Sequence, residues 1–154
     1  MSEHRLSKVV LDGATIGAPS PEIEHERQVA IFDLLEKNSF HPAGAERGPY
    51  QLTLGCEENR LLFDVAGPDY ARRHMLSLTP FRSVLKDYQI VCESYYEAVR
   101  GSSPAQIEAI DMGRRGLHNE GAELLQARLD GKIALDHETA RRLFTLVAAL
   151  QRKG

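Results

Sequence analysis

Hydrophobic side chains recur at helical spacing near the start of the chain, and the residues before them indicate where the helix begins. Ser20 is a favourable helix N-cap, and Pro21 suits the first helical position. The apolar stripe that follows predicts a helix over residues 21–38. Arg27 falls on that stripe, and we expect its aliphatic stem to pack while its charged head reaches the edge.

Hydrophobic and polar residues alternate in three short runs at 50–56, 61–65 and 74–78, which is typical of strands with one covered face. Turn-forming residues separate the runs. Such closely spaced runs predict an antiparallel meander. An earlier run at 6–11 ends at a turn signal, Asp12-Gly13, and predicts a further strand.

The second half of the chain has mainly helical signals. Thr79-Pro80 predicts the start of a helix that ends at Gly101, and residues 103–106 form a capping box before the next helix. Further helical segments follow at 120–129 and after Asp136, with a short extended link between them. The pattern predicts one α+β domain over residues 1–154: a small antiparallel sheet of three to four strands, about four helices and an all-helical C-terminal half.

Composition narrows the class of protein. The chain has 154 residues, 42% hydrophobic and 27% charged, as in an ordinary soluble globular domain. A net charge of −3 argues against a protein that coats nucleic acid. No run is long and apolar enough for a bilayer, and the N-terminus lacks a signal-peptide pattern. Cys56 and Cys92 are widely separated, which suits a reducing compartment, so we expect a cytoplasmic bacterial protein.

The segment 113–121 (GRRGLHNEG) carries the strongest candidate chemistry. Arg114, Arg115 and His118 lie between three glycines, each of which costs about 1 kcal/mol in a helix interior. In a continuous helix Arg114 would share an apolar stripe and need a counter-charge, from a carboxylate of the protein or from an anionic ligand. In a broken helix, free backbone N–H groups beside the arginines would form an anion site. A purely structural interpretation, close helix packing plus an arginine–carboxylate pair, also fits.

Patterns for metal and cofactor binding are weak. Glu22-x-x-His25 is half of the motif that di-metal helical bundles use, and the chain has no second copy. The sequence also lacks paired-cysteine zinc spacing, a Walker-type phosphate loop and a Gly-x-Ser-x-Gly motif. We therefore expect no metal and no cofactor, and the sequence assigns no catalytic residue.

Several blocks together resemble a known family. They are IEHERQVAIFDLLEKNSF, ENRLLFDV, LSLTPFRSVLKDY, CESYYEAVR, IEAIDMGRRGLHNEGAELLQARL and TARRLFTLV. The chain is similar in these blocks to uncharacterised protein family 0262, a group of small proteobacterial proteins with no assigned function. The resemblance implies a soluble cytoplasmic protein and carries no functional position.

Three functional hypotheses remain open. The first is a non-enzymatic binding or regulatory protein, able to self-associate, whose segment 113–121 contacts a partner or an anion. The second is an enzyme acting on a phosphorylated or carboxylated metabolite, with His118 as acid or base near Glu120. The third is a nucleic-acid binder that uses Arg114, Arg115, Arg141 and Arg142, which the net negative charge of the chain disfavours.

Overall fold

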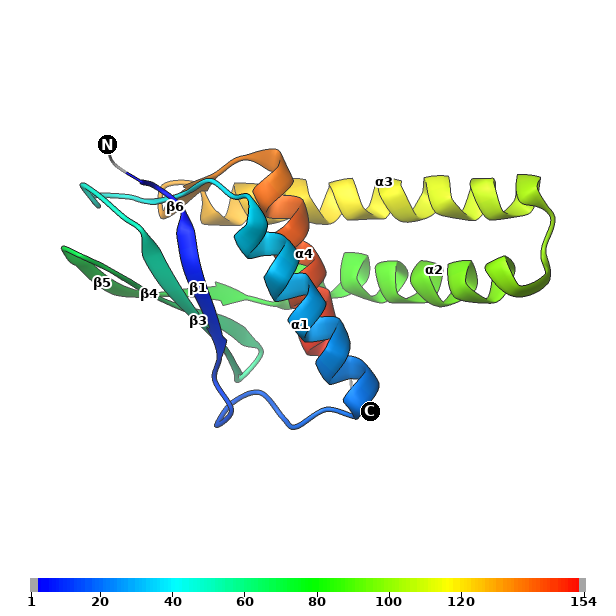
Figure 1. Ribbon diagram of the computed structural model, residues 1–154, viewed down its shortest axis with the longest axis horizontal. Coiled ribbons are helices and arrows are strands. Elements are labelled where there is room, and N and C mark those ends of the chain that lie inside the picture. Colours follow the sequence, from blue (N-terminus) through cyan, green and yellow to red (C-terminus); the bar gives the residue numbers. More distant parts are fainter. Residues whose placement is uncertain (1–2, 153–154) are drawn as a thin grey trace.

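The computed structural model describes residues 3–152 and has the predicted α+β class. A four-stranded sheet forms one side of the molecule, and helices α1 (Pro21–Glu36) and α4 (His137–Gln151) lie side by side next to it (Figure 1). Helices α2 (Arg82–Gly101) and α3 (Pro104–Leu129) form a long hairpin whose far end projects away from this body.

The main sheet has the order β1–β3–β4–β5. Its strands are β1 (Leu6–Leu11), β3 (Tyr50–Glu57), β4 (Arg60–Gly67) and β5 (Tyr70–Ser77). The predicted antiparallel meander is formed by β3, β4 and β5, whereas β1 pairs with β3 in parallel. The sheet is therefore mixed and not purely antiparallel, because alternation indicates which side chains share a face but not the direction of the strand.

A second, two-stranded sheet joins the two halves of the chain. Strand β2 (Phe40–Pro42) pairs antiparallel with β6 (Ile133–Leu135). The prediction of an all-helical C-terminal half is therefore wrong, because β6 lies in that half. Three residues are too few for alternation to separate a strand from an extended link, and the pairing depends on a partner far away in sequence.

The capping signals correctly locate three helix starts, one of them at Asp136, whose side chain accepts a hydrogen bond from the Thr139 N–H at the start of α4. The Ser20 hydroxyl accepts a hydrogen bond from the Ile23 N–H at the start of α1. At the start of α3, Ser103 and Gln106 form the predicted capping box. The Thr79-Pro80 signal instead begins a short 3-10 turn, Thr79–Phe81, which leads into α2.

Helix α3 runs without a break through Gly113, Gly116 and Gly121. The sequence left open whether this helix is continuous or broken, and the structure shows the continuous helix. Its last turns belong to the core, where Ala122, Leu125 and Leu129 are fully buried. Its first half packs only partly buried side chains against α2. The hairpin is therefore anchored at one end.

The buried face of α1 includes Arg27, contrary to the expectation that its head reaches the edge. Only 4% of this residue is exposed. Its Nη1 donates a hydrogen bond to the Gly17 carbonyl at 3.2 Å, because the loop before α1 closes over the guanidinium. A carbonyl acceptor from a loop could not be predicted from the helical stripe.

Within residues 3–152 no helix has the length and apolarity to cross a membrane.

Candidate functional site

Arg114 is paired with a carboxylate of its own helix. Its Nε donates to Asp111 Oδ1 at 3.1 Å, and its Nη2 also contacts that oxygen. The guanidinium lies over the Tyr95 ring of α2, with Cζ 4.2 Å from the ring centroid. Burial acts to lower the pKa of Arg114, but the hydrogen bonds and charge of Asp111 outweigh it and raise the pKa. This arginine is held charged between a carboxylate and an aromatic face.

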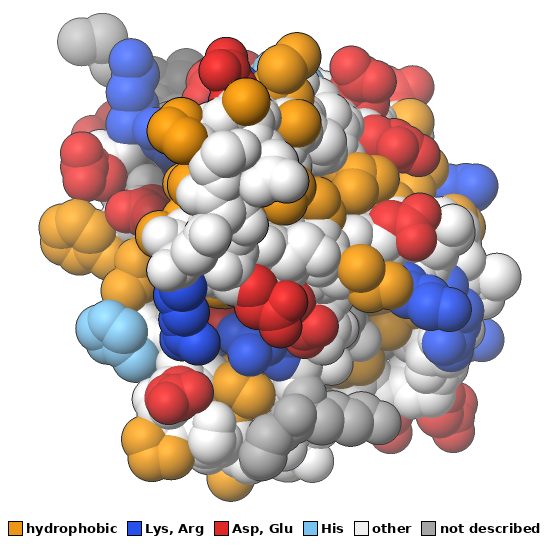
Figure 2. All heavy atoms as spheres, turned by 90° about the vertical axis from the view of Figure 1, so that its right-hand side faces the viewer, with side chains coloured by type: hydrophobic (Ala, Val, Ile, Leu, Met, Phe, Trp, Pro, Cys, Tyr) orange, Lys and Arg blue, Asp and Glu red, His pale blue; other side chains and the backbone are white. Residues whose placement is uncertain are grey.

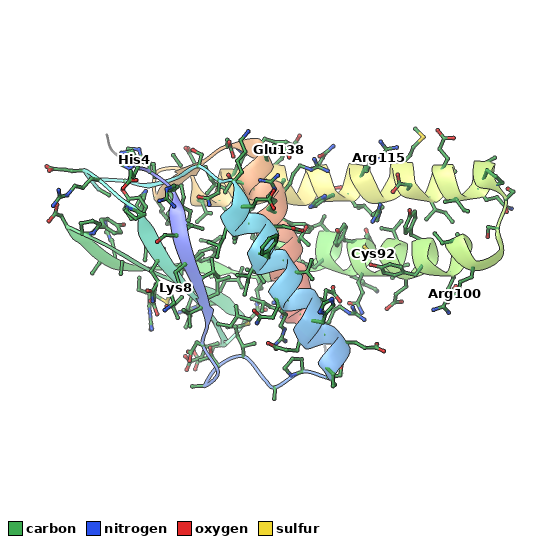
Figure 3. All side chains as sticks on the ribbon, viewed as in Figure 1. His4, Lys8, Cys92, Arg100, Arg115 and Glu138 are labelled. Atoms are coloured by element: carbon green, nitrogen blue, oxygen red, sulfur yellow. The ribbon has the colours of Figure 1, made fainter. Side chains whose placement is uncertain are left out.

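Arg115 shares the same carboxylate, since its Nε lies 3.3 Å from Asp111 Oδ2. The Arg115 side chain is 57% exposed, against 33% for Arg114. Figure 3 shows Arg115 on the outer side of α3, away from α2. One carboxylate therefore serves two guanidinium groups, and this cluster keeps one net positive charge.

His118 lies one turn further along α3 and is held by α4. Its Nε2 is 2.8 Å from the Arg141 carbonyl oxygen and 2.9 Å from the Thr145 hydroxyl, and its Nδ1 is 3.4 Å from Arg141 Nη2. These contacts fit a neutral ring that donates from Nε2 and accepts at Nδ1. Burial lowers the pKa of His118, and the ring stacks on Tyr88 with 5.5 Å between the centroids. The imidazole is thus part of the α2–α3–α4 packing.

The three glycines of the segment have different surroundings. A Cβ at Gly121 would lie 2.4 Å from the Phe144 ring of α4, so this glycine permits close packing of α3 on α4. A Cβ at Gly113 would make an ordinary contact, 3.8 Å from Val91. At Gly116 no atom lies within 4 Å. The structural interpretation from the sequence explains Gly121, and nothing in the structure explains Gly116.

A cavity of about 950 Å³ lies where the hairpin meets the body, and Arg114 is one of its lining residues. Its walls carry opposite charges. The wall formed by α1 carries carboxylates. The wall formed by α2 and α3 is mainly basic, and Glu93 is its one carboxylate among the lining residues. The charged side chains on these walls are Glu22, Glu26 and Asp33 on α1 and Arg82, Lys86 and Arg114 on the hairpin. Arg152, which follows α4, also lines the cavity and forms an ion pair with Glu26. Arg115 and His118 do not line this cavity, so only one of the three candidate residues faces it.

The floor of the cavity is aromatic and sulfur-containing. Tyr88 lies in it beside Cys92, and Cys56 reaches it from the sheet. Burial raises the pKa of Tyr88 to about 12 and also raises the pKa of the Cys92 thiol. A thiol with a raised pKa is a weak nucleophile at neutral pH. Tyr88 and Cys92 therefore provide a protonated, largely apolar surface for contact.

The Glu-x-x-His pattern lies in the first turns of α1. Glu22 and His25 both border the cavity. Across the part of the chain that the structure describes, no group of three or more His, Cys, Asp or Glu residues is placed to hold a metal ion.

The arginines of α4 are engaged in local contacts. Arg141 pairs with Glu138, their closest atoms 3.3 Å apart, and contacts His118, whereas Arg142 donates to the Lys37 carbonyl at the end of α1. On the face that Figure 2 shows, Lys and Arg side chains are interspersed with Asp and Glu. This face therefore has no extended basic surface of the kind that nucleic-acid binding requires.

Sequence reasoning missed a second cluster, near the starts of β1 and β3. The His4 and His41 rings stack with their centroids 3.5 Å apart, and His4 Nδ1 is 2.7 Å from the Tyr50 hydroxyl. Nearby, the Tyr70 hydroxyl lies 2.9 Å from Nε2 of the buried His74. No sequence signal links His4 with Tyr50 or His41, because the parallel pairing of β1 with β3 brings His4 to Tyr50, and a hydrogen bond from the Phe40 N–H to the His4 carbonyl brings His41 to His4.

The fold and site thus define a small α+β protein with a projecting helical hairpin and a charged cavity at its base. The chain belongs to the uncharacterised protein family UPF0262, whose family model matches residues 3–153. Related UPF0262 proteins include one from Phenylobacterium zucineum, 62% identical over 99% of this chain and 96% of the relative. Another, from Methylobacterium radiotolerans, is 60% identical over 98% and 95% of the two chains. No solved structure matches this chain.

Proposed function

We propose that this protein is a non-enzymatic binding protein and that the cavity between α1, α2 and α4 is its binding site, with Arg114 recognising an anionic group. The observation that carries the proposal is the surplus charge beside the cavity. Two arginines share Asp111, and Arg114 lines the cavity together with Lys86. A cavity of about 950 Å³ is at the upper end of the size of small-molecule sites.

The position of His118 supports binding over catalysis. Both of its ring nitrogens are in contact with α4, and the ring lies outside the cavity lining. A general acid or base must come within hydrogen-bond reach of the proton that it transfers. The imidazole would have to leave its contacts with Arg141 and Thr145 before it could serve a substrate in the cavity.

Thermal unfolding with added anions tests this proposal. The probes are inorganic phosphate, nucleotides and sugar phosphates. We expect at least one to raise the melting temperature, since a ligand at one hundred times its Kd stabilises the folded state by about 2.7 kcal/mol. Arg114→Ala should abolish the increase. Arg128→Ala is the matched control, because it removes an exposed guanidinium of the same helix that neither pairs with Asp111 nor lines the cavity, and it should keep the increase. If no probe stabilises the wild-type protein, the proposal is wrong.

A further inference from the structure

The cavity at the base of the hairpin is lined by equal numbers of acidic and basic side chains. The three carboxylates of α1 and Glu93 are balanced by the three basic side chains of the hairpin and Arg152. The charges are nevertheless separated in space, because most of the carboxylates belong to α1 and most of the cations to α2 and α3. The lining is therefore neutral as a whole and strongly polarised from one wall to the other.

The acidic wall is one side of α1. Glu22, Glu26, Val29 and Asp33 all line the cavity and follow one another at intervals of four, three and four residues, which places them along one side of the helix. Glu26 is paired with Arg152. Among residues 3–152, no ion pair involves Glu22 or Asp33, and none joins α1 to the basic side chains of the hairpin. The two charged walls are thus not bridged by the protein itself.

Apolar side chains complete the lining. Leu78, Leu85 and Ala148 border the cavity together with Tyr88 and Cys92 of its floor. Both of these floor groups stay protonated at neutral pH, because burial raises the pKa of the phenol and of the thiol. The cavity therefore offers an uncharged surface as well as two walls of opposite charge.

Gln151 supplies an unused hydrogen-bond donor. This residue lines the cavity, and its Nε2 is buried without an acceptor among the described residues. Buried polar atoms in folded proteins nearly always have a hydrogen-bond partner. An oxygen atom of a ligand in the cavity would accept this hydrogen bond.

We infer that the ligand of this cavity is a zwitterion, with an ammonium group for the α1 wall, a phosphate or carboxylate for Arg114, and an apolar segment between them. This inference rests on the proposed anion site. A simple anion would be attracted by the hairpin and repelled by the carboxylates of α1, so the two effects would offset each other. A ligand with both charges is attracted by both walls. Each of its charges also meets a counter-charge, which the burial of a charged group requires.

Two matched series of probes test the inference by isothermal titration calorimetry on the full chain. One series consists of ω-aminoalkyl phosphates of increasing chain length, and the other of alkyl phosphates of the same lengths. We expect an aminoalkyl phosphate to bind at least about tenfold more tightly than its alkyl counterpart, as for a hydrogen bond between charged groups. The variant Glu22→Gln with Asp33→Asn should remove this preference. Glu36→Gln is the matched control, because Glu36 is an exposed carboxylate of α1 outside the cavity lining, and it should keep the preference.

Arg114→Ala separates this inference from the proposed function. It should weaken the binding of both series, because it removes the group that binds the phosphate. Alkyl phosphates that bind as tightly as aminoalkyl phosphates and lose affinity in Arg114→Ala would overturn the zwitterion and leave the anion site intact. An unchanged affinity of both series in Arg114→Ala would overturn the anion site and the zwitterion together. A preference that persists in Glu22→Gln with Asp33→Asn, or no binding of either series, would overturn the zwitterion, and the melting experiment then decides the anion site by itself.

Discussion

Gly121 and Gly116 lie in the same helix, and alanine at these two positions should have opposite effects on stability. In both cases alanine removes the conformational freedom of glycine, which favours the helix by about 1 kcal/mol. At Gly121 the new Cβ would lie 2.4 Å from two atoms of the Phe144 ring and 2.6 Å from a third. At Gly116 the Cβ would meet no atom within 4 Å.

The cost at Gly121 follows from how firmly the Phe144 ring is held. The ring is fully buried, and its centroid lies 5.4 Å from that of Tyr88 and 6.1 Å from that of His118. Extra volume in a packed core costs about 1–3 kcal/mol, and a trapped ring places this site near the upper limit. After subtraction of the helix gain, Gly121→Ala should lose about 2 kcal/mol. Gly116→Ala should gain about 1 kcal/mol.

Thermal unfolding measured by circular dichroism checks both values. In a chain of this size 1 kcal/mol shifts the melting temperature by about 2–4 °C. Gly121→Ala should therefore melt about 4–8 °C lower than wild type, and Gly116→Ala about 2–4 °C higher. Phe144→Leu removes part of the ring, so adding Gly121→Ala to it should cost less than adding Gly121→Ala to wild type. A Gly121→Ala variant that melts at or above the wild-type temperature would refute the packing role of this glycine.

Three further measurements test the electrostatics and the helix ends. Burial lowers the pKa of His74 and of His118 in the folded protein, so the unfolded chain binds more protons below about pH 6.5. The free energy of unfolding in urea should therefore be nearly constant from that pH to about pH 8 and fall below pH 6.5, less steeply in His118→Gln. Equal slopes in the two proteins would contradict the assignment. In a spectrophotometric titration one phenol should ionise at about 12 and be missing from Tyr88→Phe. Arg142→Ala removes the bond to the Lys37 carbonyl and should cost about 1 kcal/mol in urea unfolding, whereas Arg128→Ala serves as the surface control.

The sequence predicts the elements whose signals are local. Three helix starts are correctly located, by Ser20 with Pro21, by Ser103 with Gln106 and by Asp136, because capping depends on residues within one turn. The meander is predicted equally well, since each strand is bounded by its own turn. The parallel direction of β1 and the pairing of β2 with β6 are not predicted, because they depend on strands far apart in the chain.

The candidate site also contains some features that local spacing predicts and others that depend on tertiary structure. The pairing of Asp111 with Arg115 follows from their spacing of one helical turn, and the pair is present. The cavity does not follow from any spacing, because its walls come from α1 and the hairpin and its floor includes Thr145 of α4. The stacked rings of His4 and His41 are likewise set by tertiary structure.

The residues of segment 113–121 therefore have different roles, which the composition of the segment does not distinguish. Gly121 is required by the Phe144 ring, and His118 is held by α4, so both belong to the packing of the hairpin on the body. Arg114 differs, because its carboxylate is shared with Arg115 and its guanidinium borders the cavity. One carboxylate serves two arginines, so this cluster keeps one net positive charge. The surplus charge remains after the packing has been explained, and for this reason Arg114 is the residue through which binding should be tested.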